Sequence, residues 1–509
     1  MIVRRINSAL SGLVVAGLLA SGPILMPSAL RAAPLQMAWA QDATGLDPHK
    51  QTAFSSLRLL ELVYEPLVRL DANLKVVPAL ADSWQFADDG KSLTFKLNAK
   101  AKFHSGEPVT SADVKASFER ILDEKTGAAT RANFLSIAGI ETPDAKTVVF
   151  KLSQADAPIL TAMGDINAAV VPAMAIKDGS IGTKAVGSGP FKLQEWSPNA
   201  KAVLVANAEW AAGAPGIEGV TISVLPDETA ILAALRAGKL DFALINDPLT
   251  AQLIAKESKL QLNREPGLSY HVLQLNPSRK PMTELGVRQA MSCAVDRKQV
   301  LDTASLGEGK ITGPLTVPAY ANDPGSLFCY TQNLAKAKKL MADAGFPNGF
   351  EATVIGATNE PPTAAADVQV LQSQLAAIGI KLNIQMMELN VYVDKWLKGD
   401  FDMAIAENGG RADPYTMYNR YWTKAGNLQK VSNYVDDTLD SLMQLGRSET
   451  EPAKRKDIFG KFEQHLAEAS PWIWLYSANN YTAQQQYVKG FVPTPAGSLF
   501  GLSKVTIAK

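Results

Sequence analysis

Hydrophobic and polar positions alternate on both sides of a short turn between residues 84 and 97. The hydrophobic positions of this stretch are Trp84, Phe86, Leu93, Phe95 and Leu97. Asp89-Gly90 interrupts the alternation, and a glycine after an aspartate supplies the left-handed backbone conformation that a tight turn needs. A period of two on either side of such a turn predicts a β-hairpin.

The residues that follow the hairpin change to a helical period. The apolar residues on one face of the expected helix are Val114, Phe118, Ile121 and Leu122. Thr110 is followed three residues later by Asp113, which is the spacing of a capping box at a helix N-terminus. We therefore predict an amphipathic helix that begins near Ser111.

Strand-like and helical patterns alternate through the second half of the chain. A helical stripe that ends near Gly238 precedes a strand-like run over 240–245, and another helical stripe over 334–344 ends at Gly345. Farther along, a strand-like run over 351–355 is followed by a helical stripe over 368–378 and by alternating residues over 380–386. This last series predicts a βαβ unit, and such units indicate sheets covered by helices, which is the α/β fold class.

The N-terminus has the layout of a secretory signal peptide. Arg4 and Arg5 precede an apolar stretch over 10–25, and small residues follow around Ala32. We expect residues 1–32 to be removed by cleavage after Ala32. The arginine pair lacks the neighbours that complete a twin-arginine signal, which favours the general secretory route. No cysteine lies near the cleavage region, so we expect a protein free in the periplasm without a lipid anchor.

Composition and charge indicate a globular protein. Of the 509 residues, 47% are hydrophobic and 20% are charged, which is enough for at least two cores. Removal of the three arginines of the signal peptide from 50 basic residues leaves 47, against 50 acidic ones. This balance gives no electrostatic reason to expect binding to nucleic acid or to an anionic membrane. No later apolar run is long enough to cross a bilayer.

Cys293 and Cys329 are the only two cysteines of the chain. In an oxidising compartment such a pair can form a disulfide, provided that the Cα atoms approach within ~7 Å. The spacing in the sequence does not set that distance, so two buried thiols are the alternative.

Several motifs occur in a fixed order from the hairpin onward. They are Trp84, Asp89-Gly90-Lys91, Phe95-Lys96-Leu97, Lys102-Phe103-His104, Gly106, Pro108, Asp113-Val114, Ser117, Arg120-Ile121, Val186–Phe191, Val287–Ala290 with Ala294–Arg297, and Ala412-Asp413-Pro414. This order resembles the family 5 extracellular solute-binding proteins, the dipeptide and oligopeptide receptors of ABC importers. Ser105 departs from the family pattern, which usually has aspartate there. Agreement over separated segments is more specific than any single short motif.

The resemblance implies two lobes that close on a ligand and a further domain inserted in one lobe. The expected parts are a signal peptide (1–32), a discontinuous domain I (33–68, 187–278 and 478–509), an inserted domain II (69–186) and a domain III (279–477). A ligand that lies between the lobes would be buried by closure, and its burial would favour the closed form.

The resemblance also implies a partner and a mechanism. The closed receptor would dock on a permease pair in the inner membrane, and separate cytoplasmic subunits would hydrolyse ATP. This chain has no P-loop of its own, in keeping with ATP hydrolysis by other subunits. We expect a monomer without a cofactor.

Asp413 is the first candidate for contact with the ligand. In the peptide-binding relatives, an aspartate in a segment that ends in Asp-Pro holds the α-ammonium group, and Asp413-Pro414 matches that segment. A carboxylate suits this role because a buried ammonium group must be paired. The alternatives are an Asx-type turn or a local pair with Arg411.

Further candidates surround this segment and a loop near the N-terminus. They are Asn408, Gly409, Arg411, Tyr415, Trp422, Phe54 and Ser55. Arg411 could pair with a ligand carboxylate through its planar guanidinium group, or it could be a solvated charge. Trp422 could form an apolar wall, although packing in the core is the default for aromatic residues. The loop that holds Phe54 and Ser55 matches a segment that lines the cleft in relatives, and its hydroxyls could instead cap a helix.

The class of ligand is less defined than the fold. No arginine or lysine lies between Glu351 and Lys381, where some peptide receptors place a cationic clamp, and this weakens a dipeptide assignment. Family members that do not bind peptides take up nickel chelates, opines, glutathione, haem or oligosaccharides. The histidines are scattered at His49, His104, His271 and His465, so we expect no bare metal site. For His104, within the signature, a structural role is expected.

A secreted peptidase is the opposing function class. The chain has neither a His-Glu-x-x-His zinc motif nor a Gly-x-Ser-x-Gly nucleophile elbow, so we expect no enzyme. A periplasmic chaperone or a receptor for a chemosensor would use the same cleft and is a third alternative.

Overall fold

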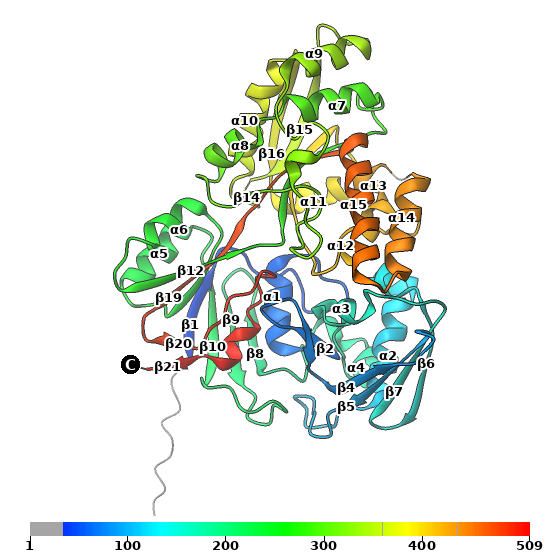
Figure 1. The fold of residues 1–509 in the computed structure, drawn as a ribbon. Coiled ribbons are helices and arrows are strands. Elements are labelled where there is room, and N and C mark those ends of the chain that lie inside the picture. The colour runs from blue at the N-terminus through cyan, green and yellow to red at the C-terminus, as the bar shows by residue number, and fades with distance from the viewer. Residues whose placement is uncertain (1–33, 359, 435, 509) are drawn as a thin grey trace, which may run out of the picture. The chain divides into compact units, whose positions relative to one another are not determined.

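The computed structural model of this protein describes residues 34–358, 360–434 and 436–508. The expected signal peptide and its cleavage site after Ala32 lie outside the described residues. Three larger sheets and two small ones organise the chain, and helices pack against them (Figure 1). Within the described ranges, no helix combines the length and the apolar character needed to cross a bilayer.

A seven-stranded sheet joins the first described strand to the C-terminal segment. Its order is β12 (Leu260–Pro266), β19 (Asn479–Gln485), β11 (Phe242–Ile245), β1 (Leu35–Trp39), β10 (Gly219–Val224), β9 (Lys201–Ala206) and β8 (Phe191–Ser197). Strand β1 is parallel to both of its neighbours, and the other pairs are antiparallel. Helices α1 (Phe54–Val63), α5 (Glu228–Arg236) and α6 (Pro248–Ile254) bury apolar faces against this part. Helix α5 and strand β11 confirm the helix and strand predicted around Gly238.

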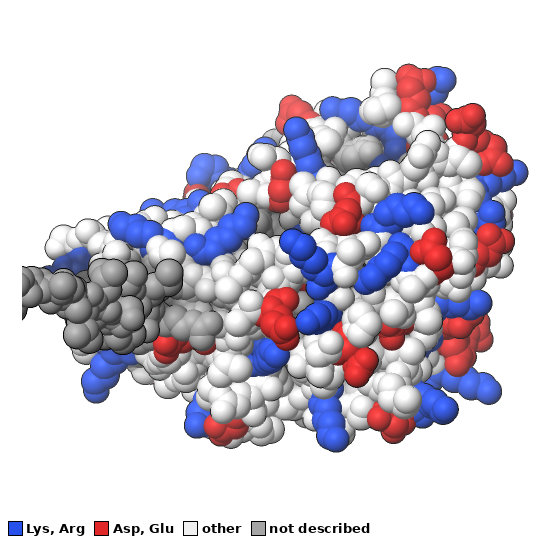
Figure 2. Space-filling model, turned by 90° about the horizontal axis from the view of Figure 1, so that it is seen from below, with Lys and Arg blue, Asp and Glu red and all other residues white. Residues whose placement is uncertain are grey.

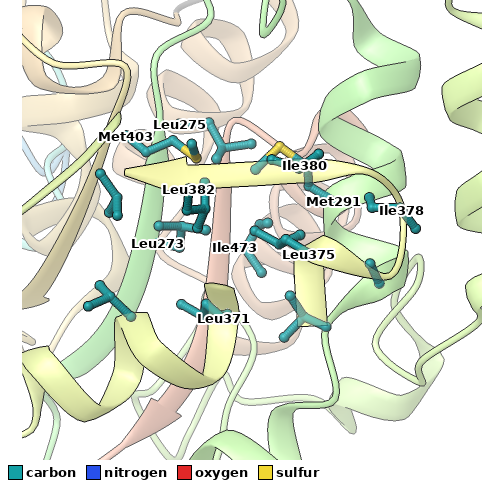
Figure 3. Packing of buried hydrophobic residues seen from close by; sticks show 14 of the residues in the cluster. Leu273, Leu275, Met291, Leu371, Leu375, Ile378, Ile380, Leu382, Met403 and Ile473 are labelled. Carbon is teal, nitrogen blue, oxygen red and sulfur yellow. The ribbon is translucent and has the colours of Figure 1, made fainter. Parts of the chain in front are cut away.

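A six-stranded sheet forms the core of a second part. Its order is β14 (Lys310–Ile311), β18 (Trp472–Ser477), β13 (Tyr270–Leu275), β17 (Met403–Asn408), β15 (Phe350–Ala357) and β16 (Ile380–Met387). Strands β15 and β16 are parallel and are connected by helix α10 (Ala364–Ala376), which confirms the predicted βαβ unit. Figure 3 shows Leu371 and Leu375 of α10 in one buried cluster with Leu382 and Ile473 of the sheet.

A four-stranded antiparallel sheet holds the predicted hairpin. Its order is β4 (Ala81–Phe86), β5 (Ser92–Leu97), β7 (Thr147–Leu152) and β6 (Ile137–Asp144). Trp84 lies opposite Phe95 in the hairpin, and Gly90 in the turn has φ of 67°. Helix α2 (Ser111–Leu122) begins where predicted, and the Thr110 N–H donates to the Asp113 carboxylate at 2.9 Å. Both predictions for this region are therefore confirmed.

Further helices and two small hairpins lie in the described chain. The remaining helices are α3 (Ile159–Met163), α4 (Ala173–Asp178), α7 (Leu285–Ala294), α8 (Arg297–Ala304), α9 (Leu334–Asp343), α11 (Leu389–Lys398), α12 (Pro414–Trp422), α13 (Gln429–Ser432), α14 (Asp437–Ser448) and α15 (Pro452–Ala469). Two small hairpins pair β2 (Val68–Leu70) with β3 (Val76–Pro78) and β20 (Val488–Lys489) with β21 (Thr506–Ile507). Helix α9 confirms the stripe predicted before Gly345.

Cys293 and Cys329 form a disulfide in this structure. Their Cα atoms are 4.6 Å apart, which decides between the two alternatives that the sequence left open. The bond ties the end of helix α7 to the loop that precedes helix α9, so it links two elements of the second part.

The domain division stays a proposal, and the sheets favour one change to it. Strand β13 ends the segment 187–278 that we assigned to the first lobe, yet it pairs with β17 and β18 in the six-stranded sheet. The neighbouring strand β12 still belongs to the seven-stranded sheet. Sheet membership therefore favours a crossing between Pro266 and Tyr270. The second crossing lies between β18 and β19, close to the proposed boundary after residue 477.

The expected inserted domain contacts the helices of the second part directly. Arg447 of α14 and Asp156 form a buried ion pair with an Nη2–Oδ2 distance of 2.8 Å. The Asn419 side chain of α12 donates to the Asn133 side chain at 2.6 Å. On the surface seen in Figure 2, basic and acidic residues intermingle, in keeping with the near balance of charge in the sequence.

Candidate ligand-binding cleft

Two adjoining cavities lie between the seven-stranded and the six-stranded parts. The first has a volume of about 420 Å³ and the second a volume of about 460 Å³. Both values fall within the roughly 300–1,000 Å³ that is usual for small-molecule sites. Eight residues line both cavities, namely Phe54, Arg58, Glu360, Leu389, Glu407, Thr494, Gly497 and Ser498. These shared residues come from both parts, so the two cavities form one cleft.

Three of the six acidic residues that line the first cavity accept hydrogen bonds from the local backbone, and Asp227 does so from the Thr229 N–H at 2.8 Å. The Glu228 carboxylate accepts from the backbone N–H groups of Asn246 and Asp247 at 2.8 and 3.0 Å. Asp247 caps α6 by accepting from the N–H groups of its first turn. These carboxylates hold the rim of the cleft in place, and their hydrogen-bonding capacity is largely used.

The second cavity has a mainly apolar wall with fixed aromatic side chains. Tyr392 and Trp396 of α11 face it, together with Leu57, Leu70 and Tyr421. The Tyr392 hydroxyl donates to the Ile405 carbonyl at 2.9 Å, and the Trp396 indole N–H donates to Gln274 at 2.6 Å. Because these polar atoms are bonded within the chain, the two side chains offer apolar surface to a ligand.

Three charged residues that line the second cavity come from the first part, Arg58 and Glu61 from helix α1 and Arg69 from strand β2. Arg58 donates through Nε to the Gly497 carbonyl at 3.3 Å. Burial lowers the pKa of Arg58, while Glu407, Glu61 and Glu360 act in the opposite direction. Burial also raises the pKa of Glu61 to about 7, although this carboxylate accepts hydrogen bonds from Ser498 and Leu499.

Glu360 and Glu407 reach the cleft from neighbouring parallel strands. Glu360 follows the C-terminal end of β15, and Glu407 lies near the C-terminal end of β17, opposite His271 of β13. Burial, and then the charge of Glu407, raise the pKa of Glu360 to about 7. Arg58 and a hydrogen bond with Gln41 oppose that shift. The two carboxylates are thus close enough to repel each other in a partly desolvated site.

Two arginines of the second cavity differ in their pairing. Arg411 forms an ion pair with Asp165 of the expected inserted domain. Arg420 of α12 lies over the ring of Tyr421, with its guanidinium carbon 4.7 Å from the ring centroid. Its buried Nε donates to no acceptor among the described residues.

Five of the residues expected at the site do line the cleft. Phe54 lines both cavities, Ser55 lines the first, and Asn408, Gly409 and Arg411 line the second. The Ser55 hydroxyl donates to the Asp42 carbonyl at 2.8 Å and does not cap helix α1. A Cβ on Gly409 would lie 3.2 Å from the Phe54 ring, so glycine allows this close approach across the cleft.

Asp413, which we expect to face a ligand, does not line either of the two cavities. The residue is 5% exposed and caps α12 by accepting from the N–H groups of Tyr415 and Thr416. Arg455 pairs with both of its oxygens, at 2.5 Å to Oδ2 and 3.0 Å to Oδ1. Its hydrogen-bonding capacity is used within the chain, so little is left for a ligand.

Tyr415 and Trp422 are also buried away from the two cavities. Tyr415 packs under the guanidinium group of Arg447, whose carbon lies 5.0 Å from the ring centroid. Trp422 packs edge-on against Trp472 with ring centroids 4.7 Å apart. Both side chains pack in the core of the second part and do not form a wall of the cleft.

Sequence reasoning did not single out the charged residues of the cleft. These are Arg58, Glu61, Arg69, Glu360, Glu407 and Arg420. One signal was present, because charged residues interrupt the otherwise apolar helix α1. Glu407 follows a fully buried run at the end of β17 and could have been noticed in the same way.

Three residues of the family motifs lie outside the cleft and bind backbone carbonyl groups of distant segments. His104 contacts the Gly189 carbonyl at 3.1 Å, and burial lowers the pKa of His104 to about 4. Arg288 and Arg297 are buried and donate to backbone carbonyls, among them those of Ala469 and Trp474.

Within the described residues, no group of three or more His, Cys, Asp or Glu side chains is placed to hold a metal ion.

Residues 75–429 match the bacterial extracellular solute-binding proteins, family 5, middle region. The chain belongs to this family. It is also 30% identical to the probable D,D-dipeptide-binding periplasmic protein DdpA of Escherichia coli (strain K12), over 433 residues that cover 82% of each chain.

Solved structures of family 5 proteins have the same fold. AgaA from A. tumefaciens R10, in complex with agropinic acid, has a TM-score of 0.85 and 30% identity, and the match covers 94% of this chain and 99% of AgaA. DppA from Helicobacter pylori, in complex with the peptide STSA, has a TM-score of 0.85 at 24% identity, with 94% and 99% of the two chains covered. The expected family and its two-lobed α/β fold are therefore confirmed.

Proposed function

We propose that this family 5 protein is the periplasmic substrate-binding receptor of an ABC importer that captures small peptides. The observation that supports this most is the cleft between the two sheet-based parts, with its apolar wall and its charged side chains. A short peptide has an apolar body and charged termini, which match such a lining. The relative that is 30% identical to this chain is described as probably binding D,D-dipeptides.

Capture would proceed by closure of the two lobes. A ligand that contacts both sides of the cleft stabilises the closed form by its differential affinity for that form. Phe54 and Arg58 on one side, with Glu407 and Tyr392 on the other, are the contacts that would couple binding to closure. The closed receptor, a monomer without catalytic activity, would then deliver the ligand to a permease pair.

An opine-like acid is the second candidate ligand. The specific observation in its favour is the 30% identity to AgaA, whose structure holds agropinic acid. Neither candidate requires a metal ion or a cofactor. The receptor role is the same in both cases, and only the ligand differs.

The experiment is native mass spectrometry of the protein purified from a periplasm without refolding. We expect a complex that carries a small added mass, and denaturing analysis should release a peptide or a ladder of peptides of similar length. An opine-like acid would replace the first candidate with the second. A sample unfolded and refolded to remove ligand is the control. If neither ligand class is carried, and a peptide pool added afterwards is hydrolysed, the receptor role is contradicted.

A further inference from the structure

Three charged side chains of the second cavity have unused capacity for hydrogen bonding or pairing. Glu360 Oε2 is buried and accepts no hydrogen bond from the described residues. The Glu407 side chain forms neither a hydrogen bond nor an ion pair with any residue in the described ranges, and the guanidinium group of Arg420 likewise has only its ring contact there. All three residues line the same cavity.

A charged side chain without a partner in the chain is unfavourable in a partly buried cavity, unless a ligand or solvent pairs with it. A charged group that leaves water loses solvation, and it regains that free energy only through a partner of opposite charge or through hydrogen bonds. Elsewhere in this chain buried charges have such partners, as Arg447 has Asp156 and Arg455 has Asp413. Among the described residues, Glu360, Glu407 and Arg420 have no partner of opposite charge within ion-pair distance, and all three line the second cavity.

The acidic and the basic side chains of this set lie at different places along the cleft. Glu360 and Glu407 line both cavities and therefore lie at their junction, whereas Arg420 lines the second cavity alone. Arg58 also lies at the junction, but one guanidinium group there faces two carboxylates. The junction is thus the acidic end of the second cavity, and Arg420 provides a basic group elsewhere in it.

We propose that the second cavity selects a dipolar ligand, whose cationic nitrogen binds Glu360 and Glu407 and whose anionic group binds Arg420. This inference rests on the proposed receptor function and adds the chemistry of its ligand. A cationic nitrogen and an anionic group are both required of the ligand, and a neutral oligosaccharide is excluded. The apolar wall formed by Tyr392 and Trp396 contacts the body of the ligand.

The first test uses three pools on the intact wild-type protein at pH 8, with ligand removed beforehand. One pool holds unmodified di- and tripeptides with mannopinic acid, the second holds the same peptides N-acetylated, and the third holds them as C-terminal amides. We expect the unmodified pool to raise the melting temperature and both blocked pools to leave it unchanged. Equal stabilisation by a blocked pool overturns the inference and leaves the receptor function intact. If none of the three pools binds, the inference and the proposed ligand classes both fail.

The second test uses calorimetry with the tightest member of the unmodified pool. Glu360→Gln, Glu407→Gln and Arg420→Gln should each weaken binding roughly tenfold or more, because each leaves a desolvated ligand charge without its partner. Glu351→Gln is the matched control, since Glu351 lies at the opposite end of strand β15 and pairs with Lys381 on the exposed surface. Unchanged affinity in both glutamate variants overturns the inference. Far-ultraviolet circular dichroism shows that each variant is folded.

Discussion

Asp413 and Glu407 lie on one short segment of the chain, yet their carboxylates have opposite surroundings. Asp413 accepts hydrogen bonds from the first turn of α12 and pairs with Arg455. Glu407 lies near the end of β17 and lines both cavities of the cleft, and it has no ion pair within the described ranges. The first carboxylate contributes to the fold, and the second is available to a ligand.

The difference shows that charge type alone does not identify a binding residue. Both are carboxylates close to a loop at the end of a strand, and the aspartate also matches a family motif. What separates them is whether the chain itself supplies the partner. A charge with an internal partner should affect stability when it is removed, and a charge without one should affect binding.

The largest expected effect comes from breaking the internal pair. Asp413→Ala leaves Arg455 buried without its partner and removes the cap of α12, so the free energy of unfolding should fall by about 3–5 kcal/mol. Chemical denaturation measures this change. Ligand affinity of the remaining folded protein should stay close to that of the wild type. A large loss of affinity with unchanged stability would indicate that Asp413 contacts the ligand and would contradict its purely structural role.

Glu407→Gln should have the opposite profile. Its affinity loss is described above. The free energy of unfolding should change by no more than about 0.5 kcal/mol, because Glu407 forms no ion pair within the described ranges and its attraction to Arg58 and repulsion of Glu360 act in opposite directions. The pKa of Glu360 should also fall from about 7, since the charge of Glu407 contributes to raising it. Carbon-13 NMR of the glutamate carboxyl groups follows that titration. A clear loss of stability would show that Glu407 has a structural partner after all.

A smaller effect concerns pH. The pKa of Glu360 is raised from 4.5 to about 7 by burial and by Glu407, against Arg58 and Gln41. Because the folded state keeps this proton to a higher pH than the unfolded chain, the contribution of Glu360 to stability is present below about pH 4.5. It is lost as pH rises toward about 7. Affinity for a cationic nitrogen should rise over the same interval, as the carboxylate ionises.

The comparison of wild type with Glu360→Gln isolates this pH effect from other titrating groups. The stability difference, wild type minus variant, should decrease from pH 4.5 to pH 7 in chemical denaturation. Over the same interval, the affinity advantage of the wild type should increase in calorimetry. If the stability difference and the affinity advantage changed in the same direction with pH, the two opposite effects assigned to ionisation of Glu360 would be contradicted.

The smallest effect is expected for Ser105→Asp, which restores the residue that is usual in the family. Ser105 is exposed and lines neither cavity, so neither stability nor affinity should change beyond error. Denaturation and calorimetry measure the two quantities side by side. A change in affinity would extend the cleft to this loop.

Local patterns predicted the elements of the fold well, because the hairpin, the capping box and the βαβ unit each depend on neighbouring residues. The cleft depends on residues that are distant in the sequence, from Phe54 to Gly497, and only the folded chain brings them together. Asp413 was assigned to the ligand from a short motif. The same Asp-Pro pair is also the signal of a helix N-cap followed by proline, and this is the role that it has in the structure.

The aromatic residues of α12 illustrate the same limit. Tyr415 and Trp422 lie on a helix whose described residues are almost all buried, and packing against Trp472 and Arg447 takes them away from the cleft. The sequence places them next to the candidate segment but does not say which way the helix faces.

The most direct measurement is native mass spectrometry of the wild type and of the Glu360→Gln/Glu407→Gln double variant, purified in parallel from a periplasm. The account predicts that the wild type carries a small molecule with a free amino group and a free carboxylate, and that the folded double variant has lost it. Equal retention of the ligand by both proteins, or a carried ligand without a cationic nitrogen, would contradict the account.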